Sequence, residues 1–254
     1  MIVLKKRADV LLVERGLVES RTKAQRLILA GEVFLKDGRR VEKPSEKLDE
    51  DCEIYIRRKL PYVSRAGLKL ETAIKEFNID VANKVCLDVG SSTGGFTDCL
   101  LKYGAKKVYA TDVGKGLLDW KLRNDSRVVV LEGINFRYFD VSLIDECLDV
   151  VTVDVSFISL LKLTEKFAQL IEKKMNPSSI FILLVKPQFE VGKEIADRFK
   201  GILPEDVSFE VALSVKNRLS NFFERYGYTC KGMVASSIKG DKGNQEYLVV
   251  FYNQ

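Results

Sequence analysis

The sequence predicts an α/β fold: a mostly parallel sheet with helices on both faces, preceded by a small α+β domain. Three observations predict it. From residue 85 onward, short apolar segments alternate with segments of helical periodicity, the order that parallel sheets require. The last two apolar segments are separated only by the polar, glycine-rich residues 236–245, which indicates an antiparallel hairpin. The first 60 residues combine two short helical segments with turn signals and do not share this alternation.

The large domain is expected to span residues 65–254. Buried apolar runs predict its strands, and amphipathic periodicity predicts the helices between them. The expected strands are 85–89, 107–111, 128–131, 148–153, 180–185, 228–235 and 246–252. The expected helices are 64–77, 96–103, 116–122, 158–174 and 204–226. The polar stretch 188–201, which contains two glycines, is either a mobile lid or an ordinary surface loop.

Residues 1–60 predict a separate small domain. A helix over 7–14 ends at Gly16, and Ser20 caps a second helix that stops at Ala30 and Gly31. Strands are expected at 32–35, 40–41 and 53–56, the first two joined by a tight turn at 37–38. The basic and proline-containing segment 57–64 reads as a connection, of which 61–64 is the linker between the domains.

The composition excludes several classes of protein. The chain has no histidine, so imidazole zinc sites are excluded and catalysis must use other side chains. Its five cysteines are widely spaced without a Cys-x-x-Cys pair, which favours reduced residues in a cytoplasmic protein and no metal site. The longest apolar run, 180–185, has six residues, so no membrane span and no signal peptide are expected.

The small positive charge of the chain lies almost wholly in its first quarter. Residues 1–60 hold 15 Lys and Arg against 11 Asp and Glu. A solvated charged face is the plain interpretation of such an excess. The alternative is RNA binding, for which the candidates on the second helix, its approach and the hairpin turn are Arg7, Arg21, Lys23, Arg26, Lys36, Arg39 and Arg40.

The order of motifs in residues 7–44 favours the second interpretation. Arg7 with Asp9, Gly16 before Leu17, Ser20 before Arg21, and Gly31 before Val33 follow one another in the string RADVLLVERGLVESRTKAQRLILAGEVFLKDGRRVEKP. This string resembles the S4 RNA-binding domain over nearly its whole length. The resemblance implies binding to phosphates and folded RNA shape rather than to base sequence.

A glycine-rich loop follows the first strand of the large domain, in the string VCLDVGSSTGGFTDCLL. It matches neither the G-x-x-x-x-G-K-[ST] nor the G-x-G-x-x-G pattern. A carboxylate at the strand end, Asp88, suits a cofactor with positive charge better than a pyrophosphate, which favours S-adenosylmethionine. A dinucleotide enzyme and a loop used only for packing are the alternatives. The expected cofactor residues are Asp88, Gly90, Ser91, Ser92, Gly94, Gly95, Phe96, Asp112 and Asn135, with Arg137 as a further candidate.

Four charged residues are candidates for the chemistry. Asp154 and Lys186 follow strands, Glu246 begins the last strand, and Lys69 lies in the helix before the first strand. Each alone reads as an exposed charge or a cap. Charged groups at the carboxyl ends of neighbouring buried strands are nonetheless where open sheets build sites.

The large domain resembles the FtsJ class of ribose methyltransferases. With the S4-like region, the strings YVSRAGLKLE, LVKPQFE and KGNQEYLVV are similar to the TlyA (hemolysin A) family. Ala66 and Ser237 depart from the usual family pattern, but neither belongs to the catalytic set. The resemblance implies a Rossmann-like class I methyltransferase sheet and S-adenosylmethionine-dependent 2'-O-methylation of cytidine in 16S or 23S ribosomal RNA, with ribosomal subunits as partners and a catalytic tetrad of Lys69, Asp154, Lys186 and Glu246.

The resemblance assigns Lys186 as the base, whereas the residues alone do not distinguish it from Lys69. A lysine suits a chain without histidine, because a neutral amine can accept the ribose hydroxyl proton. Two other functions are kept as alternatives: an RNA-binding assembly factor without activity, and a membrane-active hemolysin. The sequence offers the second little support, since its amphipathic helices all have a sheet to cover.

Overall fold

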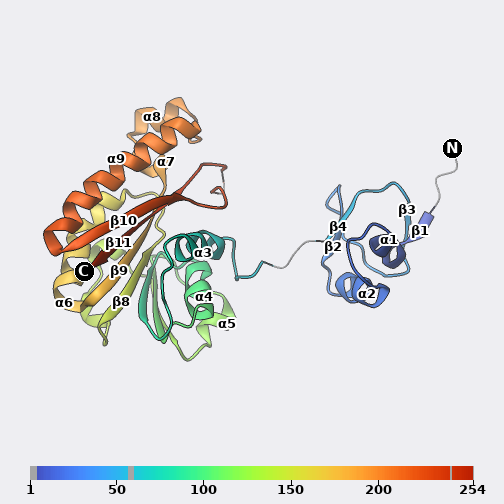
Figure 1. The fold of residues 1–254 in the computed structure, drawn as a ribbon, viewed down its shortest axis with the longest axis horizontal. Coiled ribbons are helices and arrows are strands. Elements are labelled where there is room, and N and C mark those ends of the chain that lie inside the picture. Colours follow the sequence, from blue (N-terminus) through green and yellow to red (C-terminus); the bar gives the residue numbers. More distant parts are fainter. Residues whose placement is uncertain (1–4, 57–59, 241, 254) are drawn as a thin grey trace. The chain divides into compact units, whose positions relative to one another are not determined.

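The computed structural model describes residues 5–56, 60–240 and 242–253. Two compact units divide the chain, Met1–Leu60 and Pro61–Gln254 (Figure 1). Residues 57–59 of the expected connection lie outside the described residues. Residues 61–64, expected as a linker, pack on the second unit: Tyr62 is buried, and the Val63 amide donates a hydrogen bond of 2.8 Å to Asp98. No helix in the described ranges is long and apolar enough to span a bilayer.

The first unit packs two helices over short strands. Ser20 caps the second helix as predicted, because its Oγ accepts a 3.3 Å hydrogen bond from the Lys23 amide. The strands pair as two antiparallel ribbons, β1 with β3 and β2 with β4, and Arg40 forms only an isolated bridge with Phe34. The elements are β1 (Lys5–Arg7), α1 (Ala8–Glu14), α2 (Arg21–Leu29), β2 (Val33–Leu35), β3 (Lys47–Asp49) and β4 (Ile54–Ile56).

A seven-stranded sheet forms the centre of the second unit, in the order β10-β11-β9-β8-β5-β6-β7. β9, β8, β5, β6 and β7 are parallel, whereas β11 at one side is antiparallel to both of its neighbours, β9 and the edge strand β10, which confirms the predicted α/β class. The strands are β5 (Val85–Val89), β6 (Lys107–Asp112), β7 (Val128–Glu132), β8 (Leu148–Val153), β9 (Met175–Val185), β10 (Tyr228–Ala235) and β11 (Tyr247–Asn253).

Helices cover both faces of this sheet (Figure 1). One apolar core includes Leu70 of α3, Leu100 of α4 and Leu122 of α5. The core on the other face includes Phe167 of α6 and Phe223 of α9. The helices are α3 (Ala66–Glu76), α4 (Gly95–Lys102), α5 (Trp120–Arg123), α6 (Thr164–Lys174), α7 (Pro187–Glu190), α8 (Lys193–Arg198) and α9 (Glu205–Phe223), with 3-10 turns η1 (Phe136–Tyr138), η2 (Val141–Leu143), η3 (Leu160–Leu163) and η4 (Glu224–Tyr226).

The strand order reverses beside β5. From β5 the chain proceeds outward to β6 and β7, then returns to β8 on the other side. Ligands of open α/β sheets bind outside the carboxyl ends of the strands at such a reversal. The loops after β5, β6, β8 and β9 all begin at the carboxyl edge of the sheet. The fold therefore predicts a ligand site among these four loops.

Candidate active site

The loop after β5 passes directly over the end of β8. Gly90 has φ +81°, and a Cβ atom there would lie 2.3 Å from the Asp154 carbonyl oxygen, so only glycine fits. The amides of Gly90 and Ser91 donate hydrogen bonds of 2.8 and 3.1 Å to the Thr111 carbonyl of β6. The loop is therefore tied to both neighbouring strands, and its backbone is open to close approach by a ligand.

Gly94 and Gly95, both expected around the cofactor, serve packing instead. A Cβ on Gly94, which has φ +98°, would lie 2.2 Å from Leu122 of α5. A Cβ on Gly95 would lie 2.3 Å from Ser64 Oγ and 2.8 Å from the Ala66 side chain. These two glycines let α4 begin in close contact with α5 and α3, and they line neither of the cavities at this edge.

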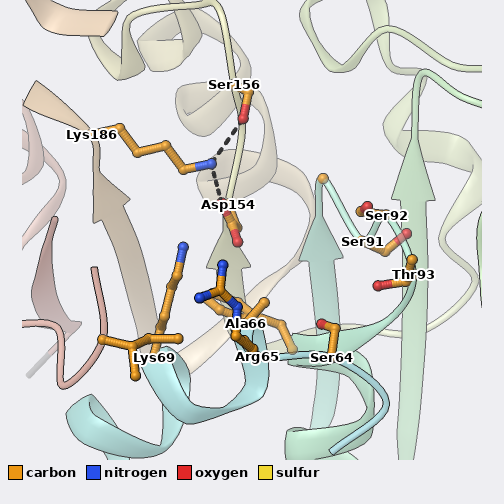
Figure 2. Close-up of a pocket in the computed structure, with 13 residues that line it drawn as sticks. Ser64, Arg65, Ala66, Lys69, Ser91, Ser92, Thr93, Asp154, Ser156 and Lys186 are labelled. Carbon is orange, nitrogen blue, oxygen red and sulfur yellow. Dashed lines mark hydrogen bonds and ion pairs between the residues drawn. The ribbon is translucent and has the colours of Figure 1, made fainter. Parts of the chain in front are cut away.

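Two neighbouring cavities lie at the carboxyl edge of the sheet. They share four residues, Gly90, Ser92, Asp154 and Ser156. The smaller cavity, of about 280 Å³, is drawn in Figure 2 and is lined by Ser64, Arg65, Ala66, Lys69, Gly90, Ser91, Ser92, Thr93, Phe96, Asp154, Ser156, Lys186 and Ile238. The larger cavity, of about 560 Å³, is lined chiefly by the ends of β5, β6 and β8 and by residues 134–137.

Asp112, at the end of β6, lines the larger cavity and organises two loops. Its carboxylate accepts a 2.9 Å hydrogen bond from the Ser92 amide and a 2.7 Å hydrogen bond from the Gly114 amide. Asn135 and Arg137 line the same cavity, and Asn135 caps η1 by accepting a 3.1 Å hydrogen bond from the Arg137 amide. The structure thus brings these three expected residues together.

Asp88 is not brought to either cavity. The residue has no exposed surface, and its carboxylate accepts hydrogen bonds from Thr97 Oγ1 at 2.7 Å and Thr152 Oγ1 at 3.0 Å. Burial raises its pKa to about 7, an effect that the threonine hydrogen bonds oppose and the Asp154 charge adds to. Asp88 is therefore part of the interior beneath the loop, a correction of its expected place beside the cofactor.

The four expected catalytic residues form two ion pairs at the smaller cavity. Lys186 Nζ lies 2.6 Å from Asp154 Oδ1 and donates a 2.9 Å hydrogen bond to Ser156 Oγ. Lys69 Nζ donates a 2.6 Å hydrogen bond to Glu246 Oε2. All four side chains are at most 13% exposed. Figure 2 shows the two lysines pointing toward the Asp154 side from different elements.

The sheet register explains why residues so distant in sequence meet. Lys186 directly follows β9 and Glu246 directly precedes β11, and Val185 is paired with Tyr247 in the antiparallel ladder between these strands. Asp154 follows the neighbouring β8, whereas Lys69 lies on α3, which covers this end of the sheet. Each side chain is therefore held by an element with a buried core face.

Six residues that line the smaller cavity were not predicted for the site, and four of them are polar: Ser64, Arg65, Thr93 and Ser156. Ser64 and Arg65 fall at the start of the helix expected next to the linker. Thr93 lies within the glycine-rich loop, and Ser156 follows Asp154 by two residues. Only their closeness to an expected residue could have indicated them, since single polar residues carry no spacing pattern.

The seven basic candidates of the first unit are all exposed, but their partners differ. Arg7 and Arg21 both contact the buried Asp9. Arg26 has no polar partner within the described ranges. The other four each pair with a surface carboxylate: Lys23 with Glu19, Lys36 with Glu53, Arg39 with Glu46, and Arg40 with Glu42.

The cavity residues fit S-adenosylmethionine. Two buried hydroxyl oxygens at the cavities, Ser91 Oγ and Thr111 Oγ1, have no hydrogen-bond partner in the structure. Such groups are costly unless a ligand or water pairs with them. The larger cavity offers apolar walls with the Asp112 carboxylate, as an adenosine requires, and carboxylates suit a cation at the shared edge. Among the described residues, no cluster of three or more acidic or cysteine side chains offers a metal site.

Fold and site together define a methyltransferase of the Rossmann-like class with an S4 domain before it. Family models agree: an FtsJ-like methyltransferase model matches residues 62–253, and an S4 domain model matches residues 6–54. The chain belongs to the FtsJ-like methyltransferase family.

Relatives resemble the chain over nearly its whole length. Hemolysin A of Brachyspira hyodysenteriae is 46% identical, over 96% of this chain and 99% of its own. The 16S/23S rRNA (cytidine-2'-O)-methyltransferase TlyA of Mycobacterium tuberculosis is 38% identical, over 96% of this chain and 88% of its own. A solved structure from Streptococcus thermophilus, which bears a hemolysin designation, aligns with a TM-score of 0.69 at 41% identity over 99% of this chain and 90% of its own.

Proposed function

We propose that the protein methylates the 2'-hydroxyl of a cytidine ribose in 16S or 23S ribosomal RNA, with S-adenosylmethionine as methyl donor. The single observation that carries the proposal is the pair of lysine-carboxylate contacts at the smaller cavity, where it adjoins the larger one. Relatives of the same architecture are named for this reaction, which supports the choice of substrate.

In this proposal the cofactor spans both cavities. Asp112 holds the ribose hydroxyls in the larger cavity, and Asn135 lies beside the adenine. The loop residues Gly90, Ser91 and Ser92 surround the methionine end, where the unpaired Ser91 hydroxyl can bond to a polar group. The reacting centre then lies where the cavities meet, beside Asp154.

The cofactor supplies a methyl group made electrophilic by a sulfonium. Lys186 must first release a proton to solvent, because its contact with Asp154 is that of a charged ammonium. The neutral amine then takes the proton of the ribose 2'-hydroxyl as that oxygen bonds to the methyl carbon, and the electrons of the carbon-sulfur bond pass to sulfur. Asp154 and Ser156 fix the Lys186 amine at the shared edge of the cavities. The products are a 2'-O-methylated ribose and S-adenosylhomocysteine.

Lys69 and Glu246 have a different role in this mechanism. The Lys69 amine is held by the nearly buried Glu246 carboxylate at 2.6 Å. A charged ammonium held in this way can donate a hydrogen bond to the ribose oxygen as negative charge develops on it. Lys69 therefore stabilises the transition state, whereas Lys186 accepts the proton.

The test combines labelled S-adenosylmethionine with intact ribosomal subunits, followed by mapping of the methylated nucleotide. Incorporation at a ribose 2'-oxygen of a cytidine is expected. Lys186→Ala should keep cofactor affinity within about threefold and reduce transfer by at least 100-fold, the lower end of the range for loss of a general base. A folded Lys186→Ala protein that methylates at the normal rate would disprove the mechanism. Cofactor-independent RNA binding without transfer would instead favour an inactive assembly factor.

A further inference from the structure

Asp9 is a charged residue without exposed surface in a domain of only 60 residues. Its carboxylate accepts four hydrogen bonds: two from Arg7, through Nε and Nη2 at 3.0 Å each, one from Arg21 Nη2 at 3.1 Å, and one from Gln25 Nε2 at 2.9 Å. The Arg7 guanidinium, more than any other partner, holds the pKa of Asp9 well below its usual range. The carboxylate is therefore an ionised anchor shared by two arginines.

Both arginines keep donors for a further ligand. Arg7 uses its Nε and Nη2 edge on Asp9, which leaves Nη1, and Arg21 uses only Nη2, which leaves Nε and Nη1. Their side chains are 43% and 56% exposed. An unanchored arginine loses about 0.5–1.5 kcal/mol of side-chain freedom when a ligand immobilises it. Because Asp9 already orders these two, a phosphate can bind them at smaller entropic cost.

The local charge balance also distinguishes Arg7 and Arg21 from the basic residues of the hairpin. Two arginines share one carboxylate at Asp9, so the cluster keeps a net positive charge. Around the hairpin, Lys36 and Arg39 each have an acid of their own, Glu53 and Glu46, at 2.5 Å. A phosphate that approaches such a pair must displace the carboxylate and is repelled by it.

We propose that Arg7 and Arg21 form a preorganised clamp for an RNA phosphate, that Asp9 is its positioning residue, and that the paired hairpin residues add little to RNA affinity. This inference rests on the proposed function, because it takes ribosomal RNA to be the ligand. It goes beyond that function by separating Arg7 and Arg21 from the paired hairpin residues Lys36, Arg39 and Arg40, with different predicted effects.

The first experiment compares two double variants of the full chain that remove the same charge. Arg7→Ala with Arg21→Ala removes the clamp, and Lys36→Ala with Arg39→Ala is the matched control. Affinity for ribosomal subunits is measured between 50 and 200 mM salt. The clamp variant should bind at least tenfold more weakly, with a salt slope reduced by about 0.7–0.9, as loss of one neutralised phosphate requires. The control should change affinity less than threefold. Equal losses in the two variants would overturn the proposal.

The second experiment tests whether Asp9→Asn strengthens or weakens RNA binding. Asp9→Asn makes the domain more positive by one, so simple electrostatic attraction predicts tighter RNA binding. A clamp that depends on Asp9 predicts binding three- to tenfold weaker. In the background that already lacks Arg7 and Arg21, Asp9→Asn should have no further effect, whereas a purely structural role would weaken binding in both backgrounds.

Two controls keep the outcomes distinct. Circular dichroism and limited proteolysis of the first unit report whether each variant is folded, and S-adenosylmethionine affinity reports whether the second unit is intact. If Asp9→Asn or the clamp variant unfolds the first unit, Arg21→Ala compared with Lys36→Ala decides the proposal, because Arg7 and Gln25 still hold the Asp9 carboxylate. If the unmodified protein binds no ribosomal RNA at any salt concentration, the proposed function fails. If it binds and the double variants lose equal affinity, only the clamp fails.

Discussion

Glu190 accepts a 2.5 Å hydrogen bond from the Ser159 hydroxyl, and this contact joins the loop after β9 to the loop after β8. The same carboxylate accepts a 2.9 Å hydrogen bond from the Leu160 amide. Burial raises the pKa of Glu190, against the effect of these hydrogen bonds. Since Asp154 and Lys186 begin these two loops, Glu190 helps to set the distance between them.

Glu190→Ala should therefore slow methyl transfer without removing cofactor binding. Both hydrogen bonds are lost, and the two loops can shift relative to each other by fractions of an ångström, which is costly for a proton transfer. We expect a five- to twentyfold lower single-turnover rate, with S-adenosylmethionine affinity within threefold. Glu194→Ala, on the exposed side of α8, is the matched control. Equal rates for the two variants would contradict this role.

Ser156 is expected to orient the catalytic amine. Its Oγ accepts the 2.9 Å hydrogen bond from Lys186 Nζ and has no other role apparent in the fold. Ser156→Ala removes one hydrogen bond to the Lys186 amine, worth roughly 0.5–1.5 kcal/mol, so transfer should fall about two- to twelvefold. Ser156→Thr keeps the hydroxyl and should restore most of the rate. Ser126→Ala, at an exposed position, should leave it unchanged. A Thr variant as slow as the Ala variant would argue against orientation by the hydroxyl.

Gly240→Ala should disturb the ion pair between Lys69 and Glu246 without changing either residue. A Cβ at this position would lie 2.4 Å from Glu246 Oε1, at the far end of a side chain that can move. We expect the carboxylate to shift away from Lys69 and transfer to fall at least tenfold, while the melting temperature changes by only a few degrees. Gly192→Ala, where a Cβ meets nothing within 4 Å, is the control for the substitution itself. Normal activity of Gly240→Ala would show that the Lys69–Glu246 distance is not critical.

The positions of the strands along the chain could be predicted from the sequence because apolar runs are a strong signal. The four charged residues that form the two ion pairs were named through their places beside strands and the family resemblance, and their catalytic roles stay a prediction. A run such as Val85–Val89 is apolar throughout, and a charge that follows it stands out. The short strand Lys47–Asp49 alternates exposed, buried and exposed, but three residues are too few for this alternation to be recognised in the sequence. Likewise β9 begins at Met175 with the polar sequence Met-Asn-Pro-Ser-Ser, so the apolar run indicated only its second half.

The loop over 188–201 shows a related limit. The structure forms α7 (Pro187–Glu190) and α8 (Lys193–Arg198) there, each six residues or shorter. Such helices depend on tertiary contacts, for example that of Glu190 with Ser159, rather than on a periodic pattern. The burial of Asp88 could not be predicted either. A strand that is buried on both faces has no periodicity to show which of its residues lie in the interior and which lie at the carboxyl end near a ligand.

The pH dependence of the free energy of unfolding of Asp88→Asn tests whether the Asp88 carboxyl is buried. The folded-state pKa, about 7, is raised from 3.8 by burial, so the folded protein binds more protons than the unfolded chain between these values. The contribution of Asp88 to the stability of the fold should therefore be greatest below about pH 4 and fall as pH rises to about 7. Asparagine can keep partners for Thr97 and Thr152 without ionising. We expect the free energy of unfolding of Asp88→Asn, relative to the unmodified protein, to increase by roughly 2–4 kcal/mol from pH 4 to pH 8.

Urea unfolding at several pH values measures this difference, and calorimetry on the same variant measures S-adenosylmethionine affinity. A buried Asp88 predicts an affinity within threefold of the unmodified protein, because the residue lines neither cavity. A cofactor contact predicts the opposite pattern, with affinity lowered tenfold or more and a stability difference that does not depend on pH. The unfolding series thus tests whether the carboxyl is buried, and the calorimetry tests whether it contributes to cofactor binding.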